Sequence, residues 1–191
     1  MPLPKRTIKV TKLDAARSQL KTAITLWFDD GDPVSILALA HGAHEILHRI
    51  YRNRGFSDLL YDARTIKEQY RKDFVRMLKA APSFIKHLNQ SPHEGEDTAI
   101  EFPLGACILF IFFSIYALKK IADELSDEEI AFWVWCAIQD PHLFLKKDIA
   151  DFVPVKMIET FTDVRNQKPK EFFNLVLRAL AFIRERKRPN S

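Results

Sequence analysis

The chain has 191 residues, 47% of them hydrophobic and only five of them glycine. That length suits one domain with a substantial core, and the scarcity of glycine and of strand-like alternation predicts an all-α fold. The net charge of +4 lies at the ends, which carry +4 over residues 5–12 and +3 over residues 184–188, and this leaves residues 13–183 near −3. Because only the ends are basic, a nucleic-acid partner is not favoured.

Start signals place the first two helices. Residues 1–10 are expected to form a flexible arm. Thr11 and Asp14 have the spacing of a capping box, which predicts a helix from there to about residue 28. The pair Asp32–Pro33 combines an N-cap residue with a proline in the first turn, and it predicts a second helix to about residue 54.

A third, heavily charged helix is predicted over residues 59–81, and Pro82 is expected to begin a short fourth helix over residues 83–88. An acidic, polar loop is predicted at residues 89–101. The spacing of apolar residues places the inner face of the third helix at Tyr61, Ile66, Tyr70, Phe74, Met77 and Leu78.

Residues 102–118 contain no charged side chain and are predicted to form a central, all-apolar helix. This stretch is at the short end of what spans a bilayer, and it is diluted by Pro103, Gly105, Ser114 and Tyr116. A helix buried in a bundle is therefore favoured over a membrane span. Three phenylalanines of this helix point in different directions, so a homodimer is expected to cover any side that the monomer leaves exposed; they are Phe110, Phe112 and Phe113.

The C-terminal half carries a second set of helix signals. Ser126 and Glu129 have the capping-box spacing, which predicts a helix through Ile138, and Asp140–Pro141 repeats the start signal of the second helix. Residues 11–186 are thus expected to be one helical domain. Its further predicted elements are short helices at 148–152 and 154–161 and an amphipathic helix at 170–186, followed by a basic tail at 187–191.

The two cysteines bear on the location of the protein. Cys107 and Cys136 lie in strongly apolar helical stretches, so both are expected to be buried thiols, and two cysteines are too few for a disulfide scaffold. Residues 1–6 lack the apolar segment of a signal peptide. A cytoplasmic location is therefore expected.

His44, Glu45 and His48 form the HExxH pattern of zinc-dependent hydrolases. Two histidines four residues apart on a helix point the same way and can bind one zinc ion, and the adjacent glutamate can act as general base toward metal-bound water. One hypothesis is therefore a metal-dependent hydrolase in which His44 and His48 hold zinc and Glu45 is the base. Without that activity no cofactor is expected.

The third zinc ligand tests this hypothesis. The longer form of the pattern requires a glycine and a histidine at positions occupied by Tyr51 and Arg54, so that class of hydrolase is excluded. A ligand elsewhere in the chain is still open. The candidates are Glu68, Glu159 with Asp163, and, for a triple-histidine site, His41 or His87.

The same histidines support a non-catalytic hypothesis. His41, His44 and His48 share a stripe beside the apolar face of the second helix, where a groove between helices can form. We expect this groove, completed by Lys86 and His87, to bind a small molecule or a protein partner. A non-catalytic binding or interaction module is therefore the leading prediction.

The order of these features resembles a family of uncharacterised bacterial all-helical proteins. The resemblance implies a bacterial source and a helical bundle, and it brings no established activity. The stretches that carry it are Leu13–Ala16, Gly31–Ser35, Ala43–Leu47, Phe84–His87 and Trp135–Pro141.

A more distant resemblance is to the HEPN group of helical bundles, which includes dimeric ribonucleases. Active members carry an arginine four to six residues before a histidine. That motif is missing at all six histidines of this chain, namely His41, His44, His48, His87, His93 and His142. The resemblance therefore implies a helical bundle in which the ribonuclease motif is not visible.

Overall fold

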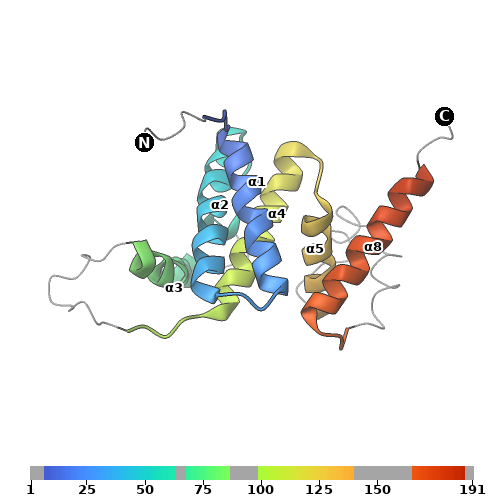
Figure 1. Cartoon of the computed structure of the whole chain (residues 1–191). Helices are drawn as coiled ribbons and strands as arrows, with labels where there is room; N and C mark the ends of the chain where they lie inside the picture. The colour runs from blue at the N-terminus through green and yellow to red at the C-terminus, as the bar shows by residue number, and fades with distance from the viewer. Residues whose placement is uncertain (1–6, 63–67, 87–98, 140–164, 188–191) are drawn as a thin grey trace, which may run out of the picture.

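The computed structural model describes residues 7–62, 68–86, 99–139 and 165–187. Within these ranges there is no strand, so the prediction of an all-α helical bundle is confirmed. The short helices predicted over 148–161, most of the loop at 89–101 and the basic tail lie outside the described residues. The elements (Figure 1) are α1 (Lys12–Phe28), α2 (Pro33–Asn53), the 3-10 turn η1 (Leu60–Asp62), α3 (Glu68–Lys86), α4 (Leu104–Ala122), α5 (Asp127–Gln139) and α8 (Pro169–Lys187).

Helices α1 and α2 begin where the sequence predicts, because each is preceded by a side chain that accepts from amides of its first turn. Thr11 Oγ1 accepts from the Asp14 amide at 3.1 Å, and the Asp14 carboxylate accepts from the Thr11 amide at 3.0 Å. Asp32 Oδ2 accepts from the Ser35 amide at 2.8 Å. α2 ends before Gly55, whose φ of +82° lies in the region that favours glycine. The two helices pack against each other.

The charged region forms one helix, α3, and the prediction of a separate short helix after Pro82 is wrong. Proline lacks the amide that would donate to the carbonyl four residues earlier, which usually breaks a helix. Pro82 is buried near the C-terminal end of α3. Burial of its ring offsets the missing hydrogen bond, so the helix continues to Lys86.

The inner face of α3 is shorter than predicted. Leu78 is buried, as expected, and Ala81 and Pro82 are buried with it. Tyr70 and Met77 are 58% and 59% exposed, so their assignment to the inner face is wrong. The buried residues all lie in the C-terminal half of α3, the half from which Lys86 reaches Glu45 of α2.

The apolar helix α4 lies inside the bundle, as predicted. Phe110, Ile111 and Ile115 are completely buried, and α4 packs mainly against α2. Phe112 stacks on Trp133 of α5 with ring centroids 4.4 Å apart. Phe112 and Phe113 are nevertheless only half-buried, and the homodimer stays a prediction.

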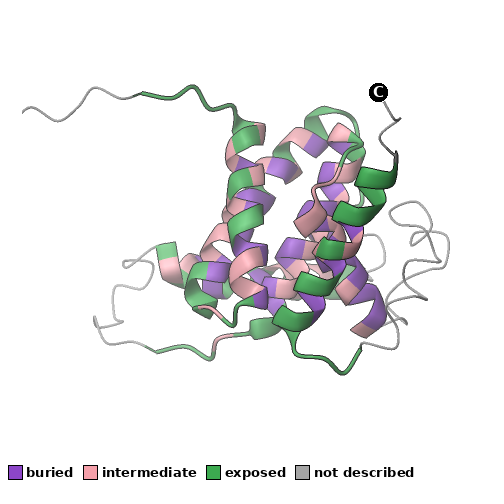
Figure 2. Ribbon diagram, turned by 45° about the vertical axis from the view of Figure 1, so that its right-hand side comes forward, coloured by how far each residue is buried: buried purple, intermediate pink, exposed green. Residues whose placement is uncertain are grey.

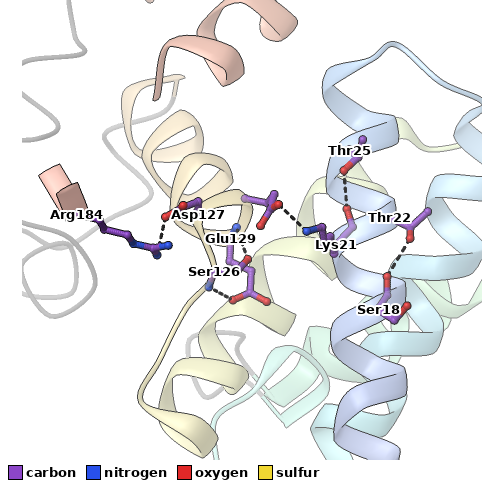
Figure 3. Close-up of polar contacts among 9 residues, drawn as sticks. Ser18, Lys21, Thr22, Thr25, Ser126, Asp127, Glu129 and Arg184 are labelled. Atoms are coloured by element: carbon purple, nitrogen blue, oxygen red, sulfur yellow. Dashed lines mark hydrogen bonds and ion pairs between the residues drawn. The ribbon is translucent and has the colours of Figure 1, made fainter. Parts of the chain in front are cut away.

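Helix α5 connects α1 to α8 through its N-terminal end (Figure 3). The capping box predicted here is confirmed, because the Ser126 amide donates to Glu129 Oε2 at 2.8 Å and the Glu129 amide donates to Ser126 Oγ at 3.3 Å. The next two carboxylates pair with neighbouring helices, Glu128 with Lys21 of α1 at 2.8 Å and Asp127 with Arg184 of α8 at 2.7 Å.

The core lies between the helices of the bundle. Figure 2 shows the buried residues on the inward sides of the helices, while the outer side of α8 is exposed. In Figure 1, α3 and α8 lie on opposite sides of the layer formed by α1, α2 and α4. The predicted histidine stripe lies on α2, between α4 and α3, at the end of the molecule away from α8.

Candidate functional site

Polar side chains meet where α2, η1, α3 and α4 come together. From α2 come the histidines of the predicted site, and His41 and His44 are 4% and 0% exposed. These two are more deeply buried than the flank of an amphipathic helix would be. Lys86 comes from the end of α3, and Tyr61, from η1, also reaches the α2 histidines. His87 lies outside the described residues.

His41 has a defined tautomer. Lys86 Nζ lies 3.1 Å from His41 Nδ1. An ammonium group only donates, so Nδ1 is the acceptor and the ring proton is on Nε2. Burial lowers the pKa of His41 to about 4, and the positive charges of Lys86 and Lys79 act in the same direction, while Glu45 opposes them. His41 is therefore neutral at pH 7.

Glu45 is held at the rim of the site. Its Oε2 accepts from Lys86 Nζ at 2.8 Å and lies 3.7 Å from His41 Nδ1. Burial is the largest effect on Glu45 and disfavours its charge. The hydrogen bond from Lys86 and the neighbouring positive charges together outweigh burial and hold the pKa of Glu45 below its usual range. Glu45 is thus a carboxylate paired with a lysine, with its side chain 53% exposed.

His44 is the centre of the cluster. Both of its ring nitrogens are buried and have no hydrogen-bond partner. Its ring centroid lies 5.7 Å from that of His48, 5.1 Å from that of Tyr61 and 5.4 Å from that of Phe110. Burial lowers the pKa of His44 to about 3, so the ring is neutral.

Tyr61, like His44, has a buried polar atom without a hydrogen-bond partner. Its hydroxyl is buried without a hydrogen-bond partner, and burial raises the pKa of the phenol. Its ring lies 5.4 Å from His48, and Lys79 Nζ lies 4.7 Å from its ring centroid. A buried polar group without a partner costs about 1–3 kcal/mol, and buried polar groups in proteins are usually paired. Other buried polar atoms also have no partner, Ser114 Oγ among them, but in this cluster two ring residues in contact with each other carry such atoms.

The described candidates for a third zinc ligand, His41 and Glu68, do not complete a metal site with His44 and His48. Among the described residues, no group of three or more histidine, cysteine, aspartate or glutamate side chains is arranged to hold a metal ion. Glu68 is 82% exposed and pairs with Arg71 on α3. Glu159, Asp163 and His87 lie outside the described part of the chain.

Tyr61, Lys79 and Phe110 also belong to the site, although the sequence does not predict them there. Its apolar spacing places Tyr61 on the third helix, and the residues next to Tyr61 give no sign of a contact with α2. The turn η1, next to the buried pair Leu59 and Leu60, carries it there. Such a contact depends on how the chain folds back, so it cannot be predicted from the spacing of residues along the sequence.

These features define an all-α bundle with a buried histidine–tyrosine cluster at the junction of α2, η1 and α4. No family model, no curated protein and no solved structure matches the chain. The two resemblances drawn from the sequence therefore stay predictions.

Proposed function

We propose that the protein is a non-catalytic binding module whose ligand contacts His44. The observation that carries this proposal is the burial of both His44 nitrogens and of the Tyr61 hydroxyl without hydrogen-bond partners. A ligand that pairs with these atoms recovers the free energy lost by burying them. A core position with no such role is served better by an apolar side chain of similar shape.

The surroundings of His44 favour binding over catalysis. Glu45 is the carboxylate of the HExxH pattern, and it accepts a hydrogen bond from Lys86. A carboxylate held in this way is a poorer general base than a free one. His41 Nδ1 accepts from the same lysine. These three side chains form a polar rim beside the cluster, in which Lys86 and Glu45 carry the charge. Ligand specificity would come from this rim together with Lys79.

A thermal-shift panel tests the binding proposal. The full chain and its His44→Phe variant are each heated with amino acids, mono- and dicarboxylates, nucleotides, sugar phosphates and first-row divalent metal ions. A compound that raises the melting temperature of the wild type, and leaves that of the variant unchanged, supports the proposal. Equal shifts in both proteins, or no shift with any compound, would contradict it.

A metal-dependent hydrolase is the second candidate. It is favoured by the neutral His44 ring beside His48 at four-residue spacing. Elemental analysis of the purified protein and of a His48→Ala variant tests it. One zinc per chain that is lost in the variant, together with hydrolysis of a peptide or ester substrate, would establish the enzyme. Metal-free protein whose melting temperature does not change with chelator would remove it.

The remaining proposals concern setting and assembly. We propose a bacterial, cytoplasmic protein; Cys107 and Cys136 are buried free thiols, which suits a reducing compartment. A homodimer is also proposed, without a nucleic-acid partner. Light scattering of the full chain tests the dimer, and a monomer at tens of micromolar protein would remove it.

A further inference from the structure

We infer that the ligand of this cluster is a transition-metal ion, bound by the imidazoles of His44 and His48 and by the phenolate oxygen of Tyr61. The inference rests on the proposed binding function and names its ligand class. It differs from the HExxH hypothesis in its third donor, because it uses a tyrosine rather than a carboxylate or a third histidine. It also requires no catalytic role for Glu45.

The spacing of the three rings supports a shared ion. Their centroids form a triangle with sides of 5.7 Å between His44 and His48, 5.1 Å between His44 and Tyr61, and 5.4 Å between His48 and Tyr61. Two imidazoles that bind one ion at a metal–nitrogen distance of about 2.0–2.1 Å have centroids about 5–6 Å apart. A phenolate bound to the same ion places its ring at a similar separation. The separations of the three rings are therefore of the size that one shared ion requires.

The unpaired atoms limit the size of the ligand. The His44 nitrogens and the Tyr61 hydroxyl are inaccessible to water as well as unpaired. A bridging water needs hydrogen-bond distances of about 2.8 Å from each partner, whereas a metal ion binds at about 2 Å. An ion is therefore the smallest ligand that can contact one His44 nitrogen and the Tyr61 oxygen together.

The charges around the cluster are also consistent with an ion. His44 is neutral and has a nitrogen lone pair to offer without first releasing a proton. Tyr61 must give its phenolic proton to solvent, and the charge of the ion favours this loss, which burial alone opposes. A divalent ion with one phenolate leaves a single net positive charge. Glu45 acts on Tyr61 as a nearby negative charge and favours the ion, while Lys79 Nζ, 4.7 Å from the Tyr61 ring centroid, opposes it.

The ligand set indicates which ions to test. Two imidazole nitrogens and a phenolate oxygen are borderline donors that suit copper(II) and zinc better than magnesium or calcium. Copper(II) bound to a phenolate absorbs visible light through charge transfer from oxygen to metal. That band gives a direct readout of the Tyr61–metal bond that does not depend on any activity.

The test uses the full chain, stripped with chelator and dialysed. Copper(II) and zinc are titrated into the wild type, His44→Phe, Tyr61→Phe and, as a matched control, Tyr51→Phe. Tyr51 is a buried tyrosine on α2 whose hydroxyl donates to the Ser57 carbonyl at 3.2 Å and whose ring contacts those of Phe56 and Tyr116. Circular dichroism and thermal melts confirm that each variant is folded.

We expect the wild type and Tyr51→Phe to bind one ion per chain and to show the copper–phenolate band. Tyr61→Phe should lose the band and bind at least tenfold more weakly, and His44→Phe should not bind stoichiometrically. A wild type that binds neither ion, or a Tyr61→Phe variant with unchanged affinity and band, would overturn the inference. If an organic compound from the thermal-shift panel stabilises only proteins with His44 while neither ion binds, the metal inference fails and the binding function stands.

Discussion

Burial of His44 places two hydrogen-bonding atoms in an apolar contact shell. Its neighbours Phe110 and Tyr61 approach it with ring geometries typical of aromatic packing, at 57° and 80° between ring planes. The ring of His44 is therefore well packed, but its two nitrogens have no hydrogen-bond partner. Substitutions that keep the ring and remove the nitrogens separate the effects of packing and of unpaired polar atoms on stability.

Replacing His44 with phenylalanine should raise the free energy of unfolding by about 1–2 kcal/mol in metal-free buffer, because the ring contacts remain and the unpaired nitrogens are removed. Urea unfolding followed by circular dichroism measures this difference. The control is His44→Asn, which keeps buried polar atoms in a smaller side chain and should lower stability by about 1–3 kcal/mol. A phenylalanine variant less stable than the wild type would mean that the imidazole nitrogens are paired in solution.

The lowered pKa of His41 makes the free energy of unfolding depend on pH. Its folded-state pKa of about 4 lies below its ordinary value of 6.5, so between these values the unfolded chain binds a proton that the folded chain does not. The stabilising contribution is complete above pH 6.5 and is lost as the pH falls toward 4. Glu45, Lys86 and Lys79 face the ring and set this window.

A His41→Gln variant should therefore lose less stability on acidification. Between pH 6.5 and pH 5 the difference should be about 1.5 kcal/mol, since one pKa unit corresponds to about 1.4 kcal/mol. Urea unfolding of wild type and variant at both pH values measures it. Parallel losses in the two proteins would show that His41 is protonated in the folded state.

At this scale, the sequence predicts only part of the site. The spacing of His41, His44 and His48 places them on one stripe of a helix, because helical periodicity is local. Tyr61 and Lys79 join them through contacts between η1, α3 and α2, which depend on loop paths. The same limitation explains why the sequence indicates a groove with half-exposed histidines, whereas His44 is fully buried.

Helix boundaries are predicted best where their cause is local. The capping boxes at Thr11 and Ser126 both form, since donor and acceptor are three residues apart. The end of α3 is predicted poorly, because burial of Pro82 in the bundle outweighs its tendency to break a helix. The exposure of Tyr70 and Met77 has a similar origin. Their spacing correctly predicts a helix, but local spacing does not show whether another element covers that face.

Helix α8 allows a comparison of apolar and ionic contacts within one element. Phe173 stacks on Phe28 of α1 with ring centroids 4.4 Å apart and planes 13° from parallel. Arg184 pairs with Asp127 of α5 at 2.7 Å, but its side chain is 59% exposed (Figure 3). Exposed ion pairs contribute little because water screens them and long side chains lose entropy. The stacked phenylalanine should therefore dominate the attachment of α8.

We expect Phe173→Ala to lower the free energy of unfolding by about 3–5 kcal/mol, and Arg184→Met to lower it by less than about 1 kcal/mol. Hydrogen exchange of the α8 amides should rise in Phe173→Ala before the exchange of α2 does, because α8 would detach first. Equal effects of the two variants would show that the ion pair positions α8.

The whole molecule is organised around α4, and α4 also raises the question of environment. Among the described residues it is the one helix long and apolar enough to cross a membrane. Half of its most apolar stretch is buried against other helices of the bundle. Ile115 is fully buried, whereas Leu104 at the N-terminal end is 56% exposed. A helix in lipid and a helix in a protein core respond differently to charge at these two positions.

If α4 is the core of a bundle in water, Leu104→Asp should change the free energy of unfolding by less than about 0.5 kcal/mol, because the carboxylate stays hydrated at a helix N-terminus. Ile115→Asp should lower it by more than about 4 kcal/mol, because an unpaired charge would be buried. Urea unfolding measures both variants, and flotation with phosphatidylcholine vesicles measures lipid association. Wild-type protein that floats with the vesicles, and an Ile115→Asp variant that no longer does while Leu104→Asp still does, would place α4 in the bilayer, since a charge near the middle of a spanning helix opposes insertion more than one at its end.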